Sequence, residues 1–347
     1  MTSSNGSAVA ARSPDGRVLV TGASGFLGGR LARRLISDGA PVRVLVRSDA
    51  KARVWADRGA ETVVGDITDR DAVRAALDSV AVVYHLAGRL FIPGVPASEY
   101  RRTHVEGTKV LIACAAESAA VRRFVHCSTT GVLGTTGDTP ADEDAPARPT
   151  NVYEATKAEA ELAVRSAWQR GLPAVIVRPG LVYGPGDLHL LGLFRSVLHG
   201  QFRPIGRRPV LLHPIYVDDL TEALVCCGER DAALRECFHI AGTEPVALSR
   251  LAASIASAEG TRLPRGSIPL PAARAVAAVG DLLPAGLKRR APLTRSRLDF
   301  LTHSRVYDVA KARRLLDFAA ATDLTTGIRQ SVAWYRRHGY LPAGTAA

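Results

Sequence analysis

The chain has 347 residues, of which 47% are hydrophobic and 22% charged, and its formal net charge is +12. This length and apolar content predict one globular α/β unit with a smaller lobe and exclude a largely disordered chain. The 45 lysines and arginines are scattered, without zinc-ligand spacing or a helix-turn-helix pattern. We therefore expect no nucleic-acid partner and favour a small phosphate-bearing ligand.

Five cysteines, an odd number, lie in apolar runs without ligand spacing, which indicates reduced core thiols, no metal site and a cytoplasmic protein. Residues 1–15 are polar and Ser-rich, lack the apolar core of a signal peptide and are predicted to be a disordered tail; residues 342–347 form a second tail. The most apolar later stretch, Ile268 to Leu287, carries charges and several prolines. It is predicted to be a lid helix and not a membrane span.

From Val18 onward, short β-branched runs alternate with helical patterns. The runs are continuously apolar, which is typical of strands covered on both faces. The predicted helices begin at about Phe26, near Lys51, at Asp69 and at about Thr103 (ending near Ala119), and a further helix carries Tyr153. This alternation predicts a doubly wound parallel sheet, the Rossmann fold, with right-handed crossovers.

After Pro179 the pattern changes to short helices near Leu191–His199 and Leu248–Ala258, a proline-punctuated stretch from Leu263 to Pro292, and a C-terminal pair of helices. This mixture predicts a smaller lobe over the C-terminal edge of the sheet. We expect a Rossmann core over residues 16–180. Residues 181–341 are expected to form mainly a substrate-binding lobe and lid, with strands and helices that return to the core.

The stretch VLVTGASGFLGG joins the first predicted strand to the first helix and spaces three glycines by three residues. Glycines suit a tight turn and close approach of the backbone to a pyrophosphate, and amides at the helix start attract the phosphates. Within a βαβ unit, this pattern predicts a dinucleotide site. Its predicted residues are Gly22, Ser24, Gly25, Phe26, Leu27 and Gly28.

The end of the second strand indicates which dinucleotide binds. An acidic residue there would accept from the ribose 2′-hydroxyl, but this strand ends in Arg47 and Ser48, and Asp49 comes two positions late. A guanidinium and a hydroxyl suit a 2′-phosphate, so NADP(H) is favoured over NAD(H). The alternative is that Arg47 is only a surface charge; Arg53 is a candidate for a second phosphate contact.

Two further strand ends supply candidate cofactor contacts. Asp66 and Ile67 can place a carboxylate by the adenine amino group and an apolar side chain against its ring, although Asp66 is also a candidate cap of the following helix. His85 is interpreted as a packed polar residue and not as a base. Small residues after it leave room for the cofactor: Leu86, Ala87 and Gly88.

Tyr153 and Lys157 lie four residues apart in a predicted helix and therefore share a face. A phenol, with a pKa of about 10, is a poor acid or base at neutrality, but a neighbouring ammonium favours the phenolate and brings it toward a useful range. Lys157 can also bond the nicotinamide ribose. The fifth strand ends in Ser128, Thr129 and Thr130, whose hydroxyls can hold a substrate oxygen.

Taken together, these motifs resemble the extended short-chain dehydrogenases/reductases. The chain carries, in the family's order, TGASGFLG, GDITD, YHLAG, the STT strand end, YEATK, RPGLVYGPGD and HPIYVDDL. The resemblance implies that Tyr153 is the general acid/base, Lys157 its helper, and Thr129 the substrate-orienting hydroxyl with Ser128 beside it. It also implies that Pro179 and the adjacent Gly180 border the nicotinamide, and it is compatible with a homodimer.

Two positions depart from the family pattern. His104 stands in THVEGT where many relatives have Asn, and Thr129 stands where Ser is commoner. Any support that the Asn gives its helix or a bound water is therefore in doubt here. Threonine keeps the hydroxyl with a restricted rotamer, so we expect activity to survive.

The stretch RRPVLLHPIYVDDL lacks the basic and acidic pair that sugar-nucleotide enzymes usually place before VDD, although Arg207 and Arg208 could contact a diphosphate. With the C-terminal stretches, it resembles the hydroxysteroid-dehydrogenase-like and dihydroflavonol-reductase-like branch. We therefore expect an NADP-dependent oxidoreductase that transfers hydride between the nicotinamide and a secondary alcohol or ketone of a largely apolar small molecule. The alternatives are a nucleotide-sugar epimerase or dehydratase with tightly bound NAD, and a non-catalytic cofactor-sensing protein.

Overall fold

The computed structural model describes residues 16–284, 291 and 293–343. The predicted tail at 1–15 lies outside these residues, as do 344–347 of the second predicted tail. Residues 285–290 and 292, which belong to the proline-punctuated stretch, also lie outside them.

A seven-stranded parallel sheet forms the centre of the molecule, with the strand order β10-β6-β5-β4-β1-β2-β3. The order changes direction between β1 and β4, which places a crevice at the carboxyl ends of these strands. The strands are β1 (Arg17–Thr21), β2 (Val42–Val46), β3 (Glu61–Val64), β4 (Val80–His85), β5 (Arg123–Cys127), β6 (Ala174–Pro179) and β10 (Cys237–Ile240).

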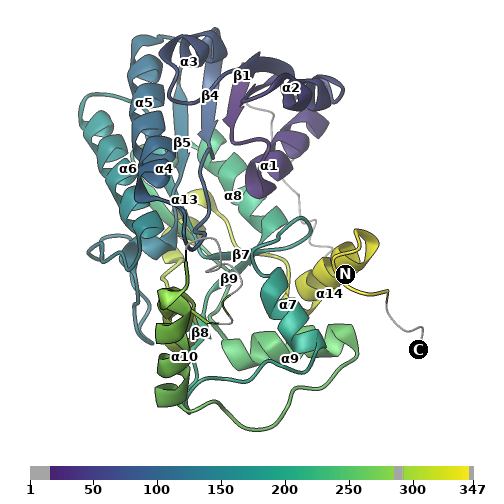
Figure 1. The fold of residues 1–347 in the computed structure, drawn as a ribbon. Coiled ribbons are helices and arrows are strands. Elements are labelled where there is room, and N and C mark those ends of the chain that lie inside the picture. Colours follow the sequence, from purple (N-terminus) through teal and green to yellow (C-terminus); the bar gives the residue numbers. More distant parts are fainter. Residues whose placement is uncertain (1–15, 285–290, 292, 344–347) are drawn as a thin grey trace, which may run out of the picture.

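Helices cover both faces of this sheet (Figure 1). One layer contains α1 (Phe26–Ser37), α2 (Asp49–Ala56), α8 (Val217–Glu229) and α13 (Ala310–Leu316). The other layer contains α3 (Arg70–Leu77), α5 (Gly107–Glu117) and α6 (Val152–Gln169). The inner strands are buried along their whole length because both faces are covered, as their apolar runs predicted. The doubly wound Rossmann fold is confirmed.

The helix predicted from Thr103 to Ala119 starts earlier and is less regular than expected. It begins as α4 (Ala97–Arg101), passes through a π-helical turn η1 (Arg102–Glu106) and continues as α5. The predicted start is wrong because α4 has only one turn and gives no periodic signal of its own. The π-helical turn holds His104, which is buried.

Much of the chain beyond β6 packs around a separate core formed by α7 (Leu191–Leu198), α9 (Leu248–Glu259) and α14 (Leu324–Arg337), whereas α8, β10 and α13 return to the parallel sheet. Two small sheets pair β7 (Leu181–Tyr183) with β9 (Pro214–Tyr216), and β8 (Leu211–Leu212) with β11 (Val246–Ala247). A further helix, α10 (Leu270–Leu282), packs on α12 (Arg295–Thr302). Short 3-10 turns are η2 (Thr130–Leu133) and η3 (Asp231–Ala233).

Three helices, α12, α13 and α14, follow the proline-punctuated stretch, so the predicted C-terminal pair is wrong; α12 and α13 are too short to show a clear period. The division into a cofactor-binding part and a substrate-binding lobe stays a prediction.

All five cysteines are free. In the parts of the chain that the structure describes, no helix combines the length and apolarity needed to cross a bilayer.

Candidate active site

The glycine turn after β1 has a geometry that only glycine allows. Gly22 has φ +77°, and a Cβ on it would lie 2.6 Å from the backbone of Leu86; a Cβ on Gly28 would lie 2.3 Å from the Gly22 carbonyl oxygen. Gly25 is the N-cap of α1 and has no side chain to accept hydrogen bonds from the first backbone amides of the helix. The first turn of α1 also holds no acidic residue. These amides suit an anion, so the corner fits the pyrophosphate of a dinucleotide.

The other predicted residues of this turn lie beside it. Ser24 and Gly25 are exposed, whereas Phe26 and Leu27 are partly buried in the first turn of α1. Phe26 packs close to Gly186, where a Cβ would lie 3.2 Å from the Phe26 ring. The structure therefore brings all six predicted residues of the phosphate site together, with Ser24 and Gly25 exposed to solvent.

Two guanidinium groups converge near the ends of β2 and β3. Arg47 is exposed at the end of β2, and Ser48 is the N-cap of α2. Arg102, from the π-helical turn, lies 3.5 Å from Oδ1 of Asp66. Burial opposes ionisation of Asp66, but hydrogen bonds from Thr68 and the charges of Arg102 and Arg47 outweigh it and lower the pKa of Asp66. Arg102 was not predicted from the sequence.

Asp66 does not cap the helix that follows it. Its Oδ1 accepts from the amide and the hydroxyl of Thr68, at 3.0 and 2.7 Å. Asp69 caps α3 instead, by accepting from two amides of the first turn. The alternative interpretation of Asp66 as a helix cap is therefore wrong. Ile67 is buried against α5, where a Cβ on Gly107 would lie 2.4 Å from it, so most of its surface belongs to the core.

The residues after β4 lie at the switch point of the sheet. The amides of Leu86 and Ala87 bond to the carbonyl and the hydroxyl of Thr21, both at 3.2 Å. Gly88 is exposed, and a Cβ on it would lie 3.8 Å from Nζ of Lys157. The ring nitrogens of His85 lie 2.8 Å from two threonine hydroxyls, and burial lowers its pKa to about 3. His85 is a packed polar residue, as predicted.

Two side-chain hydrogen bonds at the start of helix α6 set the position of Tyr153. Asn151, the N-cap, accepts from the amide of Glu154 at 3.1 Å, and the Glu154 carboxylate reaches past the N-cap and accepts from the amide of Thr150 at 2.7 Å. Tyr153 therefore lies in the first turn of the helix. Arg305 adds an ion pair to Glu154 at 3.1 Å. Neither Glu154 nor Arg305 was predicted as part of the site.

A buried ion pair fastens the middle of α6 to the sheet. Arg178 of β6 and Glu161 of α6 lie 2.7 Å apart, and both side chains are almost completely buried. A second hydrogen bond joins Nε of Arg178 to the same carboxylate at 3.0 Å. Bidentate pairing of this kind restricts both position and orientation. The helix that carries Tyr153 and Lys157 is therefore held at its start and at its centre.

Tyr153, Thr129 and Lys157 come together at the carboxyl end of β5. The Thr129 hydroxyl lies near enough to the Tyr153 phenol to oppose the rise in the pKa of that phenol. Thr129 Oγ1 accepts from the amide of Gly131 at 3.1 Å, so the hydroxyl keeps its own proton to donate. One helical turn after Tyr153, Nζ of Lys157 donates to the carbonyl oxygen of Cys127 at 2.6 Å.

The pKa of Tyr153 differs from the expectation. Burial raises the pKa of the phenol above its ordinary value, and the nearby Thr129 hydroxyl only partly opposes this shift. The expected lowering by the Lys157 ammonium is wrong for this structure, because that ammonium bonds to Cys127 and desolvation of the phenol dominates. Burial also lowers the pKa of Lys157.

Ser128 and the start of the β6–β7 connection complete this region. The Oγ of Ser128 is buried and has no hydrogen-bond partner among the residues described. Thr130 instead donates to the carbonyl oxygen of Pro179 at 3.0 Å. A Cβ on Gly180 would lie 2.3 Å from the carbonyl oxygen of His213, so glycine is required there. The unpartnered hydroxyl beside Thr129 fits a polar atom of a cofactor or substrate.

His104 connects the loop after β4 to the first turns of α6. Its Nε2 accepts from the amide of Arg89 at 3.0 Å, so the neutral ring carries its proton on Nδ1 and donates to Oγ1 of Thr156 at 2.9 Å. The ring lies edge-on to that of Tyr153, with centroids 5.5 Å apart. Burial and the nearby lysine ammonium lower the pKa of His104 to about 3, so the ring stays neutral.

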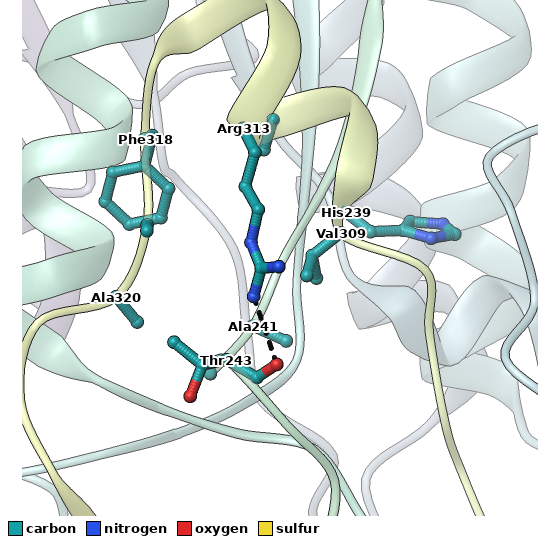
Figure 2. A pocket seen from close by; sticks show the side chains of 10 residues that line it. His239, Ala241, Thr243, Val309, Arg313, Phe318 and Ala320 are labelled. Atoms are coloured by element: carbon teal, nitrogen blue, oxygen red, sulfur yellow. Dashed lines mark hydrogen bonds between the residues drawn. The ribbon is translucent and has the colours of Figure 1, made fainter.

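A small pocket lies at the carboxyl end of β10, beside α13 (Figure 2). Arg313 crosses it and donates to the carbonyl oxygen of Thr243 at 3.2 Å. Its lining also includes His239, Phe318 and several alanines. None of the predicted catalytic or cofactor residues lines this pocket, so it is separate from the candidate site.

Fold and site place the protein among the dinucleotide-binding oxidoreductases of the short-chain type. The chain belongs to the NAD dependent epimerase/dehydratase family, the extended short-chain dehydrogenases/reductases, whose family model matches residues 18–241.

Relatives match over nearly the whole chain. The chain is 31% identical over 318 residues to 4-hydroxy-2-methyl-3-oxo-4-farnesyl-3,4-dihydroquinoline-1-oxide ketoreductase of Stigmatella aurantiaca, covering 90% of this chain and 94% of that protein. It is 31% identical over 343 residues to 3 beta-hydroxysteroid dehydrogenase/Delta 5-->4-isomerase of Mycobacterium tuberculosis, covering 92% and 90%. A solved structure, MoeE5 in complex with UDP-glucose and NAD, matches with a TM-score of 0.73 and 26% identity, covering 93% and 99%.

The family and these relatives, which are named as oxidoreductases, confirm the prediction of an enzyme of the short-chain dehydrogenase/reductase class. The family binds nicotinamide cofactors. The preference for NADP and the roles of the individual site residues stay predictions.

Proposed function

We propose that the protein is an NADP-dependent oxidoreductase that transfers hydride between the nicotinamide and a secondary alcohol or ketone of a largely apolar small molecule. The observation that carries this proposal is the position of Tyr153 and Lys157 one turn apart on α6, with the Lys157 ammonium bonded to the last residue of the strand that leads into Thr129. Relatives named as a ketoreductase and a hydroxysteroid dehydrogenase support a carbonyl or alcohol substrate. Residues 16–180 would hold the cofactor, and 181–341 would contribute most of the substrate contacts.

In the reducing direction, the bound nicotinamide supplies the hydride. The hydroxyls of Thr129 and Tyr153 orient the substrate carbonyl oxygen, and the Tyr153 phenol gives its proton to that oxygen as negative charge develops there. A pKa raised by burial keeps the phenol protonated at neutral pH, which suits a proton donor. The Lys157 ammonium, on the same helix face, would stabilise the phenolate that remains.

The residues around the glycine turn would hold the cofactor. Amides at the start of α1 face the pyrophosphate position, and Arg47 with Arg102 would bind a 2′-phosphate. The buried, unpartnered Oγ of Ser128 supports a further polar contact near the nicotinamide end.

The direct test is a substrate screen. Purified protein is mixed with NADPH and apolar ketones of steroid, acyl and quinoline type, and the loss of NADPH absorbance is followed. We expect turnover of at least one apolar ketone, and a loss of about 100-fold or more in kcat for Tyr153→Phe with little change in NADPH affinity. Undiminished turnover by Tyr153→Phe would remove that residue from the chemistry.

A second candidate function is a nucleotide-sugar epimerase or dehydratase, favoured by the match to a structure that contains UDP-glucose and NAD. Such an enzyme would keep its cofactor through purification and convert UDP-glucose without net use of NADPH. Arg207 and Arg208, the candidate diphosphate contacts, are exposed. The absorbance spectrum of the purified protein and a UDP-glucose assay without added cofactor separate the two functions. Tight NADPH binding without turnover in either assay would favour the non-catalytic cofactor-sensing alternative.

A further inference from the structure

The outer face of α10 exposes apolar side chains that no other described residue covers. We define this face as Ala272, Ala275, Val276, Val279 and Leu282, which share one side of the helix through spacings of three and four residues. Val276, Val279 and Leu282 are 45%, 64% and 84% exposed. The opposite side is formed by small residues, Ala273, Ala277 and Gly280, and is buried against neighbours that include Leu298 of α12 and Ile205.

This arrangement is unusual for a surface helix. Four of the nine large apolar side chains that are exposed in the described chain lie between Ile268 and Leu282. An amphipathic helix normally turns its larger apolar residues inward. Here the small residues anchor the helix and the large apolar ones face away from the protein, at the end of the lobe remote from the parallel sheet (Figure 1). A contiguous apolar surface of this kind marks an interaction site.

Arginines are the exposed charged residues of the two segments that adjoin α10. The segment 203–208 runs beside the residues that lead into the helix, because Ile205 and Ile268 form a β-bridge. No Asp or Glu occurs in 188–213 or in 260–280, and Asp281, in the last turn of α10, pairs with Arg295 at 3.4 Å. These segments instead carry six exposed arginines, none of which forms a salt bridge within the parts of the chain described: Arg203, Arg207, Arg208, Arg262, Arg265 and Arg274.

We propose that the outer face of α10 docks onto the surface of an anionic lipid bilayer, with the helix in the plane of the interface and the six arginines against the lipid head groups. An apolar helix face flanked by arginines is the pattern that binds at such an interface. A second copy of this chain fits less well, because a twofold contact would place the arginines of one copy against those of the other. With 13 residues, α10 lies on the bilayer and does not cross it.

Docking at this face would bring the catalytic end of the molecule toward the lipid. Helix α10 packs on α12, and Arg305 joins Asp299 of α12, at 2.7 Å, to Glu154, the neighbour of Tyr153. An apolar substrate could then enter the site from the bilayer. That consequence rests on the proposed function, whereas the docking itself does not.

Co-sedimentation of the full chain with vesicles tests the docking without any substrate. We expect the protein to bind vesicles of phosphatidylcholine with about one-third phosphatidylglycerol, to bind pure phosphatidylcholine weakly, and to dissociate as salt is added. Val279→Asp should weaken binding by about tenfold or more, because it places a charge in the apolar contact. Val54→Asp on α2, where Val54 is 48% exposed, is the matched control and should bind as the wild type does.

A second pair of variants tests the arginines. Arg207→Gln/Arg208→Gln should also weaken binding by about tenfold, whereas Arg313→Gln/Arg314→Gln, an exposed adjacent pair on α13, should not. Leu282→Asp replaces Val279→Asp if the latter melts at a lower temperature than the wild type. Three results would overturn the proposal: no binding of the wild type to anionic vesicles, equal binding by the α10 variants, or self-association through Val279 without vesicle binding. In each case the ketone screen would still test the proposed reaction independently.

Discussion

Nζ of Lys157 lies 2.6 Å from the carbonyl oxygen of Cys127, so the ammonium of α6 is bonded to the last residue of β5. The ammonium therefore occupies a fixed position beside the strand end that also carries Thr129. Burial disfavours the charge, as the lowered pKa of Lys157 indicates. A buried lysine with one backbone acceptor costs stability, so we expect the role of Lys157 to be chemical.

Lys157→Met tests this interpretation. The variant removes a buried charge but leaves the Cys127 carbonyl without its donor, and these two effects offset each other to within about 1 kcal/mol of unfolding free energy. We expect kcat to fall by about 100-fold or more while the melting temperature changes little. Activity and thermal melting of the variant, measured together, check this. A large fall in melting temperature with a proportionate loss of activity would show that Lys157 is structural.

The charges at the ends of β2 and β3 lead to a prediction about cofactor choice. Arg47 and Arg102 both favour the ionised form of Asp66, so both guanidinium groups lie close to the strand ends where a 2′-phosphate would bind. Arg47→Asp and Arg102→Gln should each weaken NADPH binding by about tenfold or more, with much less effect on NADH. Titration of intrinsic fluorescence with each dinucleotide measures this without turnover.

Lys51 provides the control for this pair. It lies on α2 and is exposed, but it does not contribute to the shifted pKa of Asp66. Lys51→Asp makes the same change of charge as Arg47→Asp on the same side of the domain. If both reversals weaken NADPH equally, the effect is a general loss of positive potential and Arg47 has no specific contact.

His104 leads to a prediction about the position of Tyr153. Its ring receives a hydrogen bond from Arg89, donates one to Thr156 and packs edge-on to the phenol. His104→Ala should remove these contacts and lower kcat by about tenfold, with a smaller change in the Michaelis constant for NADPH. His104→Asn, which keeps one donor and one acceptor, should recover part of the loss.

A pH profile separates positioning from proton transfer at this residue. The pKa of His104 is about 3, so the ring is neutral over the whole working range and should contribute no ionisation to the profile. His104→Ala should therefore lower the rate without removing a limb of the curve. Disappearance of a limb near neutral pH in the variant would contradict this and make His104 a proton carrier.

The features that could be predicted from the sequence are local ones. Gly22, Gly25 and Gly28 are specified by a single turn, and the alternating apolar runs specify the strands on both sides of it. Tyr153 and Lys157 share a helix face through their spacing alone. The start of this helix was not predicted, although Asn151 three residues before Glu154 is an N-cap signal that the sequence contains.

The features that could not be predicted depend on tertiary contacts. Arg102 meets Asp66 only because the π-helical turn packs beside the end of β3, and no sequence spacing connects them. The acceptor of Lys157 is a backbone carbonyl, which every residue has, so its identity carries no pattern. The shift in the pKa of Tyr153 was predicted with the wrong sign because burial of the phenol is a property of the folded environment.

The last prediction concerns stability and Glu259, the final residue of α9. Both carboxylate oxygens are buried without a hydrogen-bond partner among the described residues, and burial raises the pKa of Glu259 to about 7 although Arg336 opposes the shift. The position at a helix C-terminus disfavours the charge further. An acid whose pKa is raised in the folded state destabilises the protein once it ionises. The penalty is therefore absent at low pH, grows as the pH rises from about 4.5 to about 7, and is constant above that.

Glu259→Gln should therefore raise the free energy of unfolding by about 1 kcal/mol at pH 8 or so, and should change it little at about pH 5. Glu117→Gln is the matched control, because Glu117 also ends a helix, α5, but lies beside Arg74 and Arg70, which lower its pKa. Its replacement should give no gain at either pH. Chemical denaturation of both variants and the wild type at the two pH values measures the difference in unfolding free energy. If Glu259→Gln raises that free energy equally at both pH values, the gain comes from better packing of the side chain and not from loss of its charge.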